Sequence, residues 1–112
     1  KRAYRLSILV HKVTQTLPSF EKFELGSQLR RAAVSIALNI AEGYGRKDSV
    51  KEFNYFIRNC IGSCNEVQVL LDIIKDIGYI PEHSHKELIT EYEYLGRQLY
   101  RLRDSCSSKN KT

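Results

Sequence analysis

The sequence predicts an all-α protein: an up-down-up-down antiparallel four-helix bundle with left-handed packing. Three observations lead to this prediction. Apolar residues recur at alternating steps of three and four along four long segments, the spacing of one buried helix face. Proline or glycine stands between successive segments, where these residues end helices and permit turns. The strict apolar–polar alternation that marks a half-buried strand is absent from the sequence.

A proline separates the first two expected helices. The first runs from about residue 3 to residue 17, and Pro18 ends it because proline removes a backbone donor. Ser19 is expected to cap a second helix that continues unbroken to about residue 44, with Phe20 and Phe23 anchoring its start. Glycines follow at its end. The buried faces are Leu6, Val10, Val13 and Leu17 in the first helix, and Leu29, Ala33, Ile36 and Ile40 in the second.

The third and fourth helices show the most regular spacing. A capping box of Ser49 and Glu52 opens the third over residues 49–77, and Gly78 closes it. Pro81 suits the first turn of the fourth, which extends to about residue 106. We therefore expect one bundle domain over residues 1–106 and a flexible polar tail over residues 107–112. The heptad positions are Phe53, Ile57, Cys60, Cys64, Val67, Leu71 and Ile74, and then Leu88, Tyr92, Leu95, Leu99, Leu102 and Cys106.

The composition points to a cytoplasmic protein. Its 112 residues suffice to bury a core without metal or disulfides. The three cysteines are odd in number and occupy apolar helix positions, which favours reduced core thiols. The sequence contains neither an apolar run of membrane-spanning length nor a signal-peptide pattern.

The formal charge of +5 is concentrated at the two ends of the chain. In the expected topology, the start of the first helix, the loop between the second and third helices, and the end of the fourth helix share one end of the bundle. Such a basic cluster attracts phosphate backbones, and Tyr44 and Tyr100 near it are placed to stack on bases. The expected nucleic-acid-binding residues are Lys1, Arg2, Arg5, Arg46, Lys47, Lys51, Arg97, Arg101 and Arg103.

A narrow polar stripe runs along the second helix, within an arc of roughly 80°. Two interpretations stay open. The stripe forms a buried hydrogen-bonded seam with the third helix that fixes their register, or it faces a partner or a channel in an oligomer. The remainder of this helix is unusually apolar, with a second line at Val34, Leu38 and Ala41. The expected seam residues are Gln28, Arg31, Ser35, Asn39, Glu42, Ser63 and Glu66.

The sequence predicts no catalytic, metal or cofactor site. Cys60 and Cys64 lie one turn apart but occupy core positions. His83 and His85 are two residues apart, so they point in different directions on a helix. The glycines in residues 42–46 follow a helix and lack the ending of a phosphate-binding loop. We therefore expect a non-enzymatic protein.

The run QLRRAAVSIALNIAEGYGRKDSVKEF at residues 28–53, followed by Ile61-Gly62-Ser63, Glu66 and a Gly-Tyr-Ile turn, resembles the proteins encoded in 23S rRNA intervening sequences. The accessory variability protein of diversity-generating retroelements is a more distant relative. The resemblance implies a four-helix bundle, a homopentameric ring, and a basic protein that handles RNA or DNA without enzymatic activity.

Two functional hypotheses follow. The first is a non-enzymatic, oligomeric bundle that contacts RNA, DNA or a ribonucleoprotein through its basic end. The alternative is a structural or protein–protein module, an accessory subunit that docks a partner such as a reverse transcriptase without touching nucleic acid itself.

Overall fold

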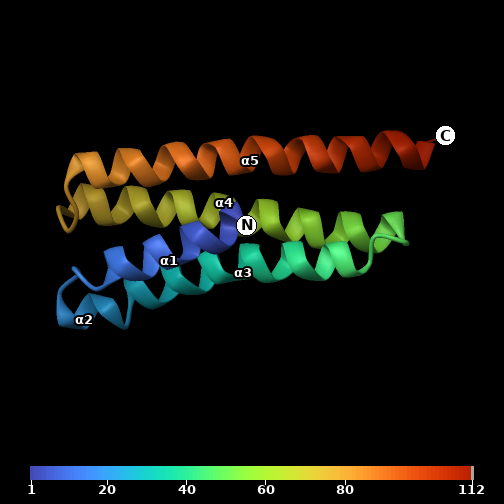
Figure 1. The fold of residues 1–112 in the computed structure, drawn as a ribbon. Helices are drawn as coiled ribbons and strands as arrows, with labels where there is room; N and C mark the ends of the chain where they lie inside the picture. Colours follow the sequence, from blue (N-terminus) through green and yellow to red (C-terminus); the bar gives the residue numbers. More distant parts are fainter. Residues whose placement is uncertain (112) are drawn as a thin grey trace.

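The computed structural model describes the backbone of residues 1–111 and the side chains of residues 1–105. Its helices are α1 (Arg2–Thr14), α2 (Ser19–Lys22), α3 (Leu25–Gly45), α4 (Val50–Ile77) and α5 (Glu82–Lys111). The four long helices pack antiparallel in sequence order, α1 on α3, α3 on α4 and α4 on α5 (Figure 1). Residues 1–111 contain no strand. The predicted all-α, up-down-up-down bundle is confirmed.

The four long helices differ in length, and this difference shapes the molecule. The bundle is 51 Å long, whereas the 13 residues of α1 span about 20 Å. The N-terminus therefore lies about halfway along, while the α3–α4 loop and the end of α5 share one end (Figure 1). The prediction that α1 also starts at that end is wrong. We call residues 36–63 and 96–111, where α3, α4 and α5 continue past α1, the three-helix half, and residues 1–35 and 64–95 the four-helix half.

The predicted second helix is interrupted near its start. It consists of α2 and α3, separated at Phe23 and Glu24. Pro18, rather than Ser19, occupies the N-cap position of α2. The Arg30 guanidinium donates to the Lys22 carbonyl (2.8 Å), one of the carbonyls that the break releases from helical bonding. Phe20 and Phe23 do not anchor this corner, because both rings are exposed.

The ends of α4 follow the predicted chemistry, except that the capping box is only half formed: the Ser49 N–H donates to the Arg46 carbonyl (3.0 Å) and not to the Glu52 side chain. The Ser49 hydroxyl accepts from the Glu52 backbone N–H (3.2 Å) at the N-cap. Gly78 has φ 95°, the left-handed conformation that closes a helix at low cost for glycine, and the Tyr79 N–H donates to the Ile74 carbonyl.

The core contains most of the predicted heptad positions, but Val13, Ile40 and Leu102 are only partly buried. All seven positions of α4 are buried, as are Leu88, Tyr92, Leu95 and Leu99 of α5. The Cys60 thiol donates to the Ile36 carbonyl (3.5 Å) and the Cys64 thiol to the Tyr92 carbonyl (3.3 Å), so both are core groups. The Cys106 side chain lies outside the described residues. No helix of the described chain combines the length and apolarity required to cross a membrane.

The buried thiols predict an alkaline loss of stability. Burial, with a smaller contribution from Cys64, raises the pKa of Cys60 from 9.0 to about 12. The contribution to stability is fully present below pH 9. It declines as the pH rises toward 12, because only the unfolded thiol releases its proton there, and the loss is about 1.4 kcal/mol per pH unit. Denaturant unfolding of the wild type and Cys60→Ala at pH 8, 9.5 and 11 checks this. Above pH 9, the difference between the unfolding free energies of the two proteins should narrow by about 1.4 kcal/mol per pH unit. A difference that stays constant with pH would contradict this prediction.

Candidate nucleic-acid interface

The two halves of the bundle differ in charge. By sequence, the three-helix half has nine basic and four acidic residues, whereas the four-helix half has nine of each. Two of the basic residues of the three-helix half, Lys109 and Lys111, lie outside the described side chains. The formal excess of +5 therefore resides in the half without α1. Surface charge of one sign gathered on one part of a protein is the electrostatic signature of phosphate-backbone binding.

Three arginines follow one another along α5. Arg97 and Arg101 are exposed, and Arg103 is half-buried. The Arg103 guanidinium lies 4.8 Å from the centre of the Tyr100 ring and 3.2 Å from the Asp104 carboxylate. Helical periodicity spreads these arginines over more than one face, so they form a broad basic surface rather than a single line.

The α3–α4 loop contributes further cations. Arg46 lies 3.8 Å from the Glu42 carboxylate and 3.9 Å from that of Glu52, two loose pairs between half-exposed side chains. Pairs of this kind contribute little and are screened by salt. Lys47 and Lys51 are exposed and have no ion-pair partner among the described residues. The α3–α4 loop lies at the same end of the bundle as the end of α5 (Figure 1).

The basic residues of α1 lie elsewhere. Arg2 and Arg5 both donate to the Glu91 carboxylate, at 2.9 and 3.2 Å, and Arg2 also stacks 4.3 Å from the centre of the Tyr94 ring. Lys1 is exposed beside them at the start of α1. Because α1 is short, these three residues lie midway along the bundle and not with the end of α5.

Sequence reasoning missed two residues of the three-helix half. Arg58 and Tyr55 of α4 are exposed, and helical spacing places them on the same face as Lys51. The signal was available: residues 51, 55 and 58 are separated by four and three positions within a helix whose boundaries were predicted.

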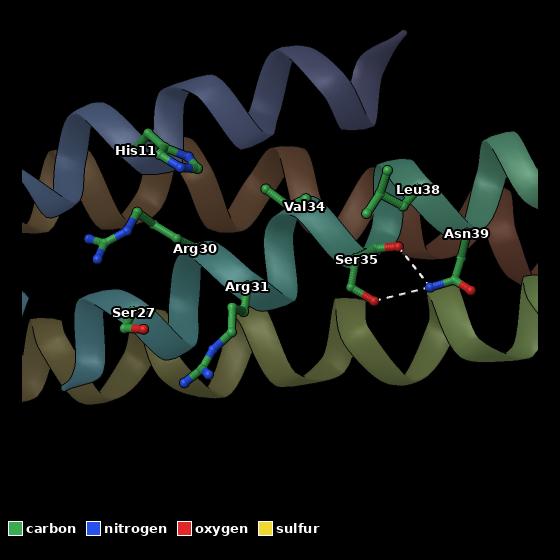
Figure 2. A pocket seen from close by; sticks show the side chains of 8 residues that line it. All are labelled: His11, Ser27, Arg30, Arg31, Val34, Ser35, Leu38 and Asn39. Atoms are coloured by element: carbon green, nitrogen blue, oxygen red, sulfur yellow. Dashed lines mark hydrogen bonds between the residues drawn. The ribbon is translucent and has the colours of Figure 1, made fainter. Parts of the chain in front are cut away.

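Ser35 is the one residue of the polar stripe of α3 that forms a hydrogen bond to α4 among the described residues. The hydroxyls of Ser35 and Ser63 are 3.0 Å apart and join the two helices. The Asn39 amide nitrogen donates to the Ser35 carbonyl (2.8 Å) and to its hydroxyl (3.0 Å), as Figure 2 shows. These three residues are half-buried. The other four residues of the predicted seam are exposed: Gln28, Arg31, Glu42 and Glu66.

We predict that Asn39→Ala changes the unfolding free energy by less than about 1 kcal/mol. Both bonds of the Asn39 amide nitrogen stay within α3, and their loss, about 1 kcal/mol, is offset by the better helix propensity of alanine. Ser35→Ala, which removes the cross-helix bond, serves as the comparison in thermal melts. A loss of 2–3 kcal/mol for Asn39→Ala would indicate a tightly buried amide instead.

A shallow groove of about 560 Å³ lies on the outer surface of α3 beside α1. His11 comes from α1, while Arg31, Val34 and Leu38 belong to α3 (Figure 2). Leu38 is 61% exposed, so the second apolar line of this helix is open. Among the described residues, no group of three or more His, Cys, Asp or Glu side chains is placed to hold a metal ion.

Comparisons with known proteins agree with this architecture. A family model described as 23S rRNA-intervening sequence protein matches residues 1–101. A crystal structure of a protein of unknown function from the S23 ribosomal protein family of Bacteroides thetaiotaomicron superposes with a TM-score of 0.84. It is 16% identical, and the match covers 91% of this chain and 94% of that one, which indicates a shared fold. No curated protein matches the chain.

Proposed function

We propose that this chain, which belongs to the 23S rRNA-intervening sequence protein family, is a non-enzymatic, oligomeric bundle that binds RNA or DNA through its three-helix half. The observation that carries the proposal is the charge division, since the four-helix half is formally neutral and the three-helix half holds the whole excess of +5. Cations that meet phosphates release condensed counterions, so binding of this kind is tight at low salt and independent of sequence.

Salt-dependent RNA binding tests the proposal. The purified protein should bind a fluorescent RNA oligonucleotide at 50 mM salt, and log K should fall linearly with log salt. The comparison is an unrelated protein of the same net charge whose basic residues are scattered. Binding no tighter than that of the comparison protein at 50 mM salt would refute the nucleic-acid function.

Two exposed apolar lines support the oligomeric part of the proposal. One is Leu38 with Val34 on the outer surface of α3, beside the exposed Arg31. The other consists of Val69, Ile73 and Ile77 on α4, spaced four residues apart and all exposed. Exposed acids accompany it at Glu66, Asp72 and Asp76.

The two lines differ in charge and lie on different helices, which favours a contact between unlike faces of two copies. The apolar line beside the Arg31 cation is complementary to the apolar line beside the acids of α4, because the apolar surfaces can pack together while the opposite charges attract. A contact between unlike faces builds a ring when the rotation between copies closes. The homopentamer suggested by the family resemblance is an assembly of this type. A ring also repeats the basic half on every subunit and strengthens a weak contact through effective concentration.

Light scattering tests this assembly. Leu38→Asp and Ile73→Asp each put a charge into one line, so each variant alone should give monomers. Mixed together they should form a dimer, because one intact face of each kind remains. Phe23→Asp, which alters an exposed ring outside both lines, should keep the assembly. A wild type that is monomeric at all concentrations, or a mixture that stays monomeric, would contradict the proposed contact.

The same apolar lines favour a second candidate function, docking of a protein partner such as a reverse transcriptase without direct nucleic-acid contact. In that case the protein binds RNA no more tightly than the comparison protein of equal net charge. The Leu38→Asp and Ile73→Asp variants then lose binding to the protein partner.

A further inference from the structure

We infer that the basic surface of the three-helix half takes an unpaired nucleic-acid strand rather than a duplex, with Tyr100 and Tyr55 as stacking platforms for its bases. This inference rests on the proposed nucleic-acid function and names the class of nucleic acid that the surface fits.

Tyr100 combines exposure with a fixed position. Its ring is 40% exposed, and the Arg103 guanidinium lies over it at 4.8 Å. A cation over the ring is attracted to its π-face and limits the orientations that the side chain samples. Tyr100 therefore presents a partly exposed ring directly beside the Arg103 guanidinium, a group that can bind phosphate.

Tyr55 on α4 is similarly presented. It is 61% exposed, and it meets Phe56 in an edge-to-face contact with ring centres 5.2 Å apart. Such a contact favours a defined ring orientation while most of the ring stays exposed. Lys51 and Arg58 lie on the same helix face, about 6 and 4.5 Å along the axis on either side of Tyr55.

The packing of α4 on α5 sets the two tyrosines at a similar level along the bundle axis. The Cys64 thiol bonds to the Tyr92 carbonyl, and Gly96 also lies against Cys64, since an added Cβ would be in ordinary van der Waals contact with its sulfur at 3.6 Å. The helices are antiparallel, so residues beyond Gly96 on α5 lie alongside residues before Cys64 on α4. Tyr100 and Arg103 are therefore level with the Tyr55–Arg58 segment of the neighbouring helix.

Aromatic rings among cations suit unpaired strands because of where the bases are. In a duplex the base faces are stacked on one another, so a protein ring on the outside meets only backbone and groove edges. In a single strand each phosphate is followed by a base that is free to stack on a tyrosine, and the stacking tolerates any sequence. Duplex binding alone would need the arginines and lysines but not the exposed rings.

The experiment compares a fluorescent oligouridine with an RNA duplex of equal length, using the full chain. Tyr55→Leu with Tyr100→Leu should weaken oligouridine binding by roughly a hundredfold, because each of the two lost stacking contacts carries a factor of about ten, and should leave duplex binding unchanged. Tyr100→Phe should retain oligouridine binding, since the ring remains. The matched control is Tyr4→Leu, which removes an exposed ring from the four-helix half.

Equal losses for both RNAs, or no loss for oligouridine with helical content preserved, would overturn the inference while the proposed function stands. A wild type that binds neither RNA at 50 mM salt overturns the proposed function and this inference together. The two failures are therefore distinguishable by the wild-type titration alone.

Discussion

Replacing Arg97, Arg101 and Arg103 by Gln should lower the salt slope of single-stranded RNA binding by about 2, because each lost phosphate contact removes about 0.7. Relative to 1 M salt, where the electrostatic contribution vanishes, this slope corresponds at 50 mM salt to a loss of about 500-fold in affinity. The three side chains lie on α5 outside the buried core, so the helical content should not change. Titrations of the labelled RNA between 50 and 300 mM salt, with circular dichroism of each variant, give the measurement.

The control for this triple variant removes the same charge from the other half. Lys1, Lys12 and Lys86 are exposed, and their replacement by Gln leaves the same net charge as the arginine variant. This control should lose little affinity if binding depends on where the cations lie. If both triple variants weaken binding equally, only the total charge matters and the three-helix half is not the interface.

The bundle could be predicted because the periodicity of apolar residues is a local property of each helix. Phe53, Ile57 and Cys60 are buried because they repeat on one face of α4, whatever the rest of the chain does. The end of α4 at Gly78 is equally local, since it depends on the left-handed conformation of one residue.

The basic residues of α1 were predicted in the wrong place, and in the structure their partners are distant in the sequence. Arg2 meets Glu91 across 89 positions, a contact that no spacing rule indicates. The break between α2 and α3 likewise involves the Arg30 side chain, which joins Thr14 to the Lys22 carbonyl. The short length of the first helix was predictable, because its expected span of residues 3–17 is shorter than the 20–44 of the second helix. The N-terminal arginines were assigned to the wrong part of the molecule because the expected topology used the direction of each helix and not its length.

One interpretation of the sequence was that the polar stripe would contact α4, but the sequence did not indicate which of its residues would be buried. Ser35 bonds to Ser63 as the spacing on the two helices suggested, but burial along the stripe follows from how closely the backbones approach. Gly43 shows this dependence, because an added Cβ there would lie 3.3 Å from Phe56 of α4.

Tyr92→Phe should raise the unfolding free energy by about 1 kcal/mol, although it removes a polar group from a natural core. Tyr92 is fully buried, and its hydroxyl has no hydrogen-bond partner among the described residues. Burial also raises the pKa of this phenol well above its ordinary value. An unsatisfied buried hydroxyl keeps its desolvation cost, which an apolar replacement of the same shape removes.

Tyr92→Ala should have the opposite effect and lower the unfolding free energy by about 3–5 kcal/mol, because it leaves a cavity where the ring packed. The contrast separates the ring, which stabilises the bundle, from the hydroxyl, which does not. Denaturant unfolding at pH 7 measures both, and Tyr94→Phe, on an exposed ring of the same helix, serves as the control. If Tyr92→Phe is destabilised by 1 kcal/mol or more, the hydroxyl donates a hydrogen bond in solution.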